Sequence, residues 1–226
     1  MSDELTKPLI KVHTTKYREI NIPERMNNEL AELVGIHFGD GGIHVRKRKT
    51  YNVTCSFNVN EVELIEEYKR LMKNLFGLEP KSYLRSNCVE FYCCSKLLAY
   101  FLNQNFNAPL GRKENLMIPP IIKLNTEYLQ YFLRGLFKTD GCLIKNNSHG
   151  KEYPIIKITN KSKEFIEEIT SSLIDMGFKA KARSKCNKKY NGYDTILCGF
   201  NQLYKWKQEI LKEDGAAGTF NAPTKR

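Results

Sequence analysis

The sequence lacks the long apolar stretches that a membrane span or a secretion signal needs. Its first residues, MSDELTKPL, contain no apolar signal region, and no run approaches the roughly 18 consecutive apolar residues of a transmembrane helix. We therefore expect a soluble protein that is not secreted. Among 226 residues, 41% are hydrophobic and 27% charged, which excludes fibrous and disordered classes.

Acidic residues are also few relative to basic ones. The chain has 25 Asp and Glu against 36 Lys and Arg, a formal net charge of +11. A polyanion such as nucleic acid is therefore the leading class of partner, although ribosome-associated, heparin-binding and merely solubilising roles share this signature.

Metal-site and disulfide spacings are missing as well. The seven cysteines include no C-x-x-C pair, and the four histidines show no metal-ligand spacing. These patterns argue against a structural zinc site, a disulfide framework and a histidine nuclease site. We expect reduced, mostly buried thiols in an intracellular protein, with cytoplasm and organelle equally compatible.

An internal repeat organises the chain. LVGIHFGDGG at 33–42 is matched by LRGLFKTDGC at 133–142. After each copy, periodicity predicts two strands, a helix, two strands and a helix. The second strand of the first repeat alternates core-facing Val53, Cys55, Phe57 and Val59 with Asn52, Thr54, Ser56 and Asn58. An accidental similarity would not repeat the element order, so we predict an α+β protein built from two αββαββα repeats.

The repeat also sets the expected domain boundaries. We expect an N-terminal repeat over 1–106 with a leading segment 1–28, a proline-containing linker over 107–124, a C-terminal repeat over 125–211 and a tail over 212–226. Asn125 is a candidate N-cap for the second motif helix.

Both motif helices carry a stripe of small residues. The stripes are Ala31, Gly35 and Gly39 in the first helix, and Gly135 and Thr139 in the second. Small side chains four apart let two helix backbones touch. Since each stripe ends one residue before an aspartate, packing the stripes together brings Asp40 and Asp140 side by side.

Two adjacent carboxylates at helix C-termini repel each other and oppose the helix dipoles. A cation between them relieves this, and a few oxygen ligands with open positions suit Mg²⁺. A divalent metal combined with a polyanion points to phosphodiester cleavage. The alternative is that both Asp-Gly pairs simply end their helices as turns.

The two motifs resemble the paired signature helices of LAGLIDADG homing endonucleases of the single-chain type. The similarity extends from about Glu29 to Leu211 and includes the ENLMIPPIIK connection. It implies a monomeric, pseudo-twofold enzyme of an intron-borne mobile element. Its two antiparallel sheets would form a saddle over a long asymmetric site in double-stranded DNA and cut both strands with Mg²⁺ or Mn²⁺.

The resemblance also implies residue roles. Asp40 and Asp140 match the catalytic, metal-binding aspartates, and the carbonyls of Gly39 and Thr139 match the metal-facing backbone. Family members place a basic residue after the second strand of each repeat, which makes Lys161 a catalytic candidate. The first repeat offers Asn60 there, so unequal strand cleavage, nicking or replacement by Lys96 are open alternatives.

Strand alternation predicts which side chains face DNA. The expected DNA-binding set is Arg46, Arg48, Asn52, Thr54, Ser56, Asn58, Lys81, Tyr83, Arg85, Lys145, Lys157, Lys181, Arg183 and Lys185. In the major groove, Arg reads guanine and Asn reads adenine, whereas Lys more often contacts phosphate.

Three other functions share these features. An RNA-splicing maturase and a catalytically inactive DNA-binding protein could use the same scaffold, but neither needs the paired acids Asp40 and Asp140. An intein is disfavoured because the sequence starts with an ordinary Met and ends in TKR.

Overall fold

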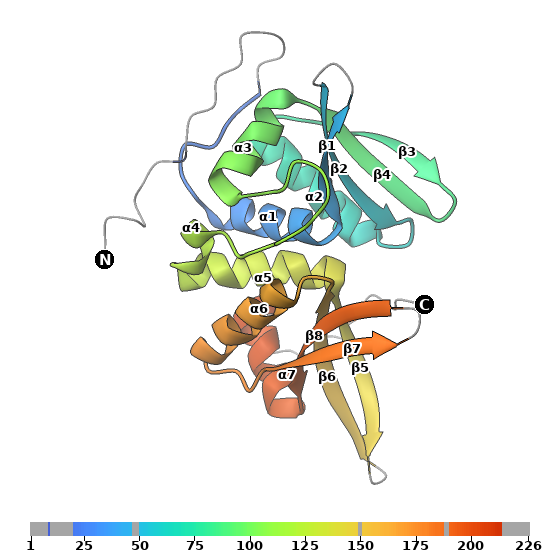
Figure 1. Cartoon of the computed structure of the whole chain (residues 1–226), viewed down its shortest axis with the longest axis vertical. Coiled ribbons are helices and arrows are strands. Elements are labelled where there is room, and N and C mark those ends of the chain that lie inside the picture. The colour runs from blue at the N-terminus through green and yellow to red at the C-terminus, as the bar shows by residue number, and fades with distance from the viewer. Residues whose placement is uncertain (1–8, 10–19, 47–49, 149–150, 188–189, 214–226) are drawn as a thin grey trace.

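The computed structural model describes residues 9, 20–46, 50–148, 151–187 and 190–213 (Figure 1). Each half opens with a motif helix, α1 (Asn28–Asp40) or α5 (Thr126–Asp140). Asparagines cap both helices: Asn27 accepts a hydrogen bond from Leu30 N at 2.8 Å, and Asn125 accepts one from Tyr128 N at 3.1 Å. The cap predicted at Asn125 is confirmed.

The element order repeats as the sequence predicts. The first half continues with β1 (Gly41–Arg46), β2 (Thr50–Asn58), α2 (Val62–Phe76), β3 (Lys81–Arg85), β4 (Cys88–Cys94) and α3 (Lys96–Phe106). A short helix, α4 (Pro120–Lys123), lies in the connection. The second half continues with β5 (Gly141–Ser148), β6 (Lys151–Asn160), α6 (Lys163–Asp175), β7 (Lys181–Asn187), β8 (Tyr190–Cys198), α7 (Phe200–Trp206) and the π-helical turn η2 (Lys207–Leu211). The α+β class is confirmed.

Each half forms one antiparallel four-stranded sheet, with strand orders β1-β2-β4-β3 and β5-β6-β8-β7. The motif helices run directly into the first strands, where Gly41 pairs with Cys55 and Gly141 pairs with Ile158. Figure 1 shows α1 and α5 lying side by side at the middle of the molecule, with one sheet on each side of them. The pairs Gly41–Cys55 and Gly141–Ile158 are therefore equivalent, and we use them to identify equivalent residues in the two halves.

One face of each sheet packs on helices and forms the core. In the first sheet Val53, Cys55 and Phe57 are buried, and the Phe57 ring lies 5.2 Å from that of Tyr68 on α2. The alternation also predicts Val59 in the core, which is wrong because β2 ends at Asn58 and leaves Val59 exposed.

In the second sheet Ile156 and Ile158 are buried, and the Thr195 hydroxyl lies 2.8 Å from that of Thr170 on α6. We call the opposite face of each sheet, turned away from these helices, its open face. Since side chains alternate along a strand, residues in register with one another share a face.

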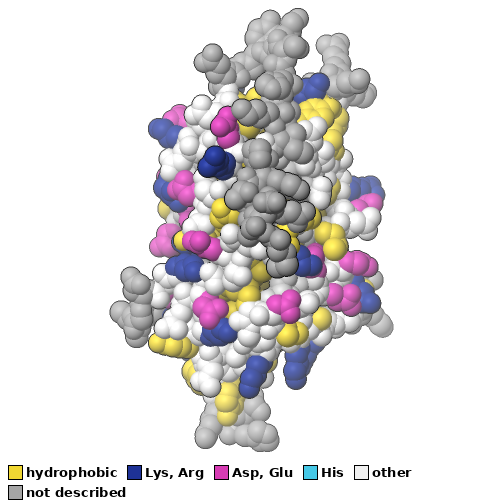
Figure 2. All heavy atoms as spheres, turned by 90° about the vertical axis from the view of Figure 1, so that its left-hand side faces the viewer, with side chains coloured by type: hydrophobic (Ala, Val, Ile, Leu, Met, Phe, Trp, Pro, Cys, Tyr) yellow, Lys and Arg dark blue, Asp and Glu magenta, His cyan; other side chains and the backbone are white. Residues whose placement is uncertain are grey.

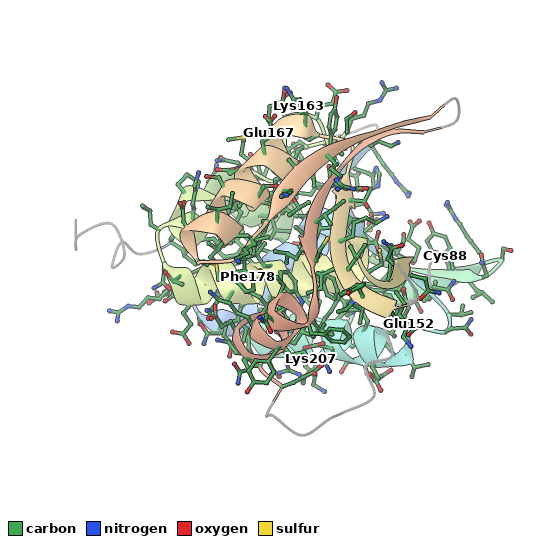
Figure 3. All side chains as sticks on the ribbon, turned by 90° about the horizontal axis from the view of Figure 1, so that it is seen from below. Cys88, Glu152, Lys163, Glu167, Phe178 and Lys207 are labelled. Carbon is green, nitrogen blue, oxygen red and sulfur yellow. The ribbon has the colours of Figure 1, made fainter. Side chains whose placement is uncertain are left out.

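The helical side of the molecule carries both signs of charge. Figure 2 shows acidic and basic side chains interspersed over it, and Lys163 and Glu167 on α6 (Figure 3) lie 3.4 Å apart. None of the helices in the described part of the chain combines the length and the apolar character that crossing a membrane requires.

Candidate active site and nucleic-acid interface

The seam between α1 and α5 is closed backbone to backbone. A Cβ atom on Gly35 would lie 2.1 Å from the carbonyl oxygen of Phe132, and one on Gly135 would lie 2.1 Å from that of Glu32. Further along, a Cβ on Gly39 would lie 1.8 Å from Thr139 Oγ1. Only residues without a Cβ allow this approach, so the predicted packing of the small-residue stripes is what the structure contains.

The two aspartates end these helices at the bottom of the seam. The backbone N–H groups of Gly41 and Gly141 make the last helical hydrogen bonds, to the carbonyls of His37 and Phe137, and each helix ends after its aspartate because both glycines have extended backbone. Asp40 and Asp140 are both half-buried. Contact between their chain neighbours Gly39 and Thr139 brings the two helix ends together.

The linker delivers a lysine to this point. Gly111 N donates to the carbonyl of Ile43 on β1 at 2.8 Å, which holds the linker along the edge of the first sheet. From there Lys113 Nζ donates to the carbonyl oxygens of Phe38 at 2.8 Å and Gly39 at 2.6 Å. The carbonyl of Gly39, matched above to a metal-facing group, therefore already faces a cation.

Electrostatics shows that both aspartates act on this lysine. Burial lowers the pKa of Lys113 below its usual value, although the charges of Asp140, Cys55 and Asp40 act in the opposite direction. The adjacent His37 is buried, and its pKa falls to about 3 because of burial and the nearby Lys113 charge. His37 is therefore neutral at neutral pH, and the positive charge at this point is that of Lys113.

The donor set of the site suits a hard divalent cation. It offers two carboxylates and neighbouring backbone carbonyls, all oxygen ligands of the kind Mg²⁺ and Mn²⁺ prefer. A carbonyl oxygen has two lone pairs, so that of Gly39 can bond Lys113 and also face a metal. In the described ranges, no three His, Cys, Asp or Glu side chains gather into a metal cluster.

Asn160 is a second site residue that the sequence did not single out. Its Nδ2 donates to Asp140 Oδ2 at 3.2 Å. Asn160 lies two residues after Ile158, so its equivalent in the first half is Phe57, two residues after Cys55. The side chain of Phe57 is buried and cannot form a hydrogen bond. The surroundings of the two aspartates therefore differ between the halves.

The strand register also changes one predicted pair of equivalent residues in the two repeats. The sequence pairs Lys161 with Asn60, but the strand register pairs Lys161 with Asn58. Asn60 lies beyond the end of β2, exposed, where its N–H bonds the side chain of Asn58 at 3.0 Å. Lys161 is exposed at the turn between β6 and α6. Neither contributes to the contacts described around Asp40 and Asp140.

A buried ion network supports the seam next to the site. Lys138 of α5 bonds Glu32 of α1 at 2.8 Å and also bonds Glu67 of α2, while Arg134 Nε lies 3.2 Å from Glu32. Burial raises the pKa of Glu32, against the opposing charges of Lys138 and Arg134. The pKa of Glu67 is lowered, because the same two cations outweigh its burial.

Most of the predicted DNA-binding residues of the first half share the open face. Register places there Arg46 of β1, Asn52, Thr54, Ser56 and Asn58 of β2, and Lys81, Tyr83 and Arg85 of β3. Asn52 and Thr54 are nevertheless buried, because β2 is a central strand. Their register neighbours His44, Tyr92 and Cys94 lie on the same face. The expectation of a fully accessible polar β2 face is wrong for these two residues.

In the second half, Lys157, Lys181 and Arg183 share the open face. Lys145 lies on the other face with Leu143 and pairs with Glu152 at 3.2 Å (Figure 3). Its predicted orientation is corrected, because β5 alternates from Leu143, which packs against the core. Arg48 and the side chain of Lys185 lie outside what the structure describes.

The cysteines are less buried than the sequence predicts. Of the described free cysteines, only Cys55 is fully buried, Cys88, Cys93 and Cys142 are half-buried, and Cys94 and Cys198 are exposed.

Comparison with known proteins identifies the scaffold. Residues 127–211 match the family model described as a LAGLIDADG-like domain. The chain belongs to the LAGLIDADG family. The homing endonuclease I-DmoI in complex with DNA and Mn has a similar fold, with a TM-score of 0.59 at 20% identity over 83% of this chain and 98% of that one. I-AabMI bound to uncleaved DNA gives 0.55 at 16% identity over 83% and 84%.

Sequence relatives of this LAGLIDADG protein include larger enzymes. A DNA polymerase of Thermococcus sp. (strain GE8) is 33% identical over 190 residues, which cover 82% of this chain and 11% of the polymerase. The replication factor C small subunit of Methanocaldococcus jannaschii is 27% identical over 222 residues, which cover 90% and 11%. The chain spans about a tenth of these relatives. Both matches therefore cover most of this chain and a small part of each relative.

Proposed function

We propose that this LAGLIDADG protein is a site-specific homing endonuclease that makes a double-strand break in duplex DNA by divalent-metal-dependent phosphodiester hydrolysis. The observation that carries this proposal is the convergence of Asp40 and Asp140 at the bottom of a glycine-closed seam, beside a lysine, Lys113, whose pKa the charges of both carboxylates act to raise. A structural role would not need two acids at one point. Basic open faces on the sheets of both halves supply the surface that a polyanion requires.

Within this proposal, Asp40 and Asp140 would hold Mg²⁺ or Mn²⁺ together with the carbonyls of Gly39 and Thr139. When bound, such an ion activates water and stabilises the leaving oxygen of the phosphodiester. The ammonium group of Lys113 is fixed by two carbonyls and offsets the negative charge that a phosphate brings to the site.

The surroundings of Asp40 and Asp140 differ, which predicts unequal cleavage of the two DNA strands. Asn160 Nδ2 orients the carboxylate of Asp140, while Phe57 occupies the corresponding place near Asp40. We therefore expect the two strands to be cut at different rates. Lys161 remains our candidate for electrostatic support on the side of the second repeat, with Asn60 as its polar counterpart from the sequence.

Target recognition would use the open faces. Paired strands fit the major groove, where Arg and Lys contact guanine or phosphate. Equivalent positions in the halves differ, as with Tyr83 in the first and Arg183 in the second, so we expect a long asymmetric target. Because one chain supplies both halves, a monomer suffices.

Cleavage of a randomised duplex-DNA library in Mg²⁺ tests this proposal. We expect one preferred sequence to be cut on both strands, and Asp40→Asn and Asp140→Asn each to abolish double-strand cleavage while DNA binding persists. Intact double-strand cleavage by both variants would refute the mechanism. Binding without cleavage under Mg²⁺ or Mn²⁺ would favour an inactive DNA-binding protein, and unchanged intron splicing by the aspartate variants would favour a maturase.

A further inference from the structure

An apolar patch interrupts the open face of the second sheet. Ile144 of β5, Ile155 of β6 and Cys198 of β8 form one row across three strands, because Ile155 pairs with both of the others. Tyr153 is the next residue of β6 on the same face. Ile144 and Tyr153 are each 40% exposed, and Cys198 is exposed as well. We call these four residues the apolar patch.

The equivalent row of the first sheet is polar. By strand register it consists of His44, Asn52 and Cys94. There the Cys94 thiol donates to Asn52 Oδ1 at 3.4 Å, and His44 is exposed. The second sheet therefore presents branched aliphatic side chains where the first presents groups that form hydrogen bonds.

The apolar patch lies beside the basic residues of the same face. The adjacent row, one step nearer the seam, contains Lys157 and Lys181, both in register with Ile196. Lys181 and Arg183 are exposed. Exposed apolar side chains that gather in one place mark a contact surface. A partner that fits here combines negative charge with small apolar groups.

Duplex DNA has this combination, and a second copy of the chain does not. The major groove presents the C5-methyl group of thymine between two rows of phosphates. A second copy packed face to face would place Lys157 and Lys181 opposite the same lysines, and like charges brought together at an interface oppose association.

We propose that the apolar patch is a specificity-determining surface that contacts thymine methyl groups in the major groove of one half-site. This inference rests on the proposed function. Apolar side chains read thymine through this methyl group, which no other base of unmodified DNA presents there. The polar row of His44 and Asn52 does not provide such a contact, so the preference belongs to the half-site that the second sheet binds.

The position of the apolar patch also limits where these thymines lie. Ile144 follows Asp140 by four strand residues, a distance of about 13 Å. Figure 1 shows β5 and β6 leading away from the seam between the motif helices. One turn of the DNA duplex measures about 34 Å. We therefore expect the thymines within one helical turn of the cut.

Replacing thymine with uracil tests this inference on the unaltered full chain. Selection from a randomised duplex library first defines the sequence that wild type binds. Each thymine is then replaced singly by uracil, which forms the same base pair but lacks the methyl group. We expect binding to weaken roughly four-fold for each contacted methyl, in one half-site only. Ile144→Ser should no longer distinguish thymine from uracil at one of these positions.

Val45→Ser is the matched control. Val45 is also β-branched and is 47% exposed on a first strand, but it lies on the helix side of its sheet with Ile43. This variant should respond to uracil as wild type does.

The outcomes separate this inference from the proposed function. If wild type selects a sequence but uracil weakens binding nowhere, or if Ile144→Ser responds to uracil as wild type does, this inference is wrong while the proposed function stands. If wild type sediments as a dimer that Ile144→Ser dissociates, a second copy covers the apolar patch, which also overturns it. If wild type binds no DNA, the proposed function fails as well.

Discussion

Gly135 lies in the backbone-to-backbone contact between the two halves, and its substitution measures how tightly the seam is closed. In Gly135→Ala the new Cβ would lie 2.1 Å from the carbonyl oxygen of Glu32 and 2.9 Å from the backbone nitrogen of Ile36. Ordinary van der Waals contact begins at 3.4 Å, so the helices must separate by more than an ångström. Both opposing atoms belong to the backbone, so no change of rotamer relieves the clash.

The size of the effect follows from two opposing terms. Forcing a methyl group into a packed site costs about 1–3 kcal/mol, and a backbone clash belongs at the upper end. Alanine in place of glycine returns about 1 kcal/mol of helix propensity. We expect a net loss of about 2 kcal/mol, which lowers the melting temperature by about 4–8 °C in calorimetry.

Cleavage should respond more strongly than stability, because separation of the seam moves Asp40 and Asp140 apart. A misplacement of about 1 Å can cost about 100-fold in rate. The two repeats also predict an equivalent result at Gly35. In Gly35→Ala the new Cβ would lie 2.1 Å from the carbonyl oxygen of Phe132, so this variant should lose as much stability and activity as Gly135→Ala.

Gly42→Ala is the control for stability, because its Cβ would meet side-chain atoms of His44 and Thr54 at 3.4 Å or more, which are ordinary contacts. Its melting temperature should change by less than about 2 °C, the equivalent of about 0.5 kcal/mol. Unchanged melting temperature and cleavage in both Gly35→Ala and Gly135→Ala would show that the helices do not touch as described.

Three further predictions concern other contacts. Lys113→Met should slow single-turnover cleavage about 100-fold with DNA binding retained, because it removes a positioned charge. The control is Arg112→Met, which changes the exposed neighbouring residue. Equal cleavage rates in the two variants would exclude Lys113 from the site. Lys138→Met should lower the free energy of unfolding by about 3 kcal/mol in denaturant titration, since it leaves Glu32 buried beside fewer cations. The double variant Lys138→Met with Glu32→Gln should recover part of this loss. An equal loss in the single and double variants would contradict the ion network. At pH 8 an alkylating agent should modify the exposed Cys94 well before Cys55, whose thiol pKa burial raises; mass spectrometry of timed digests would disprove this if Cys55 reacted first.

The seam could be predicted from the sequence because its cause is local. Small residues four apart form a stripe on any α-helix, and two such stripes, each ending next to an aspartate, predict that the two helices pack along them. The same reasoning gave the open-face residues of β3 and β7, because strand alternation has a fixed period of two. In both cases the relevant pattern lies within a single element.

The errors arose where an element's end or neighbours decide the outcome. The sequence pairs Asn60 with Lys161 because each follows a strand, yet the hairpin between β5 and β6 is longer than that between β1 and β2, and this shifts the register. Asn52 and Thr54 obey the alternation but are buried by side chains from adjacent strands, whose order the sequence does not reveal.

Lys113 shows why a site can contain a residue that the sequence does not reveal, even when the other residues of that site belong to a sequence motif. It lies in a segment with no periodicity, and it reaches the aspartates only because the linker pairs with the free edge of β1 through Gly111 and Ile43. That pairing requires the first sheet to be complete, and the sheet in turn requires α1 to end at Asp40. The linker that joins the two repeats therefore also brings a lysine to the point where the seam places two aspartates, so the proposed active site depends on three segments that fold into contact together.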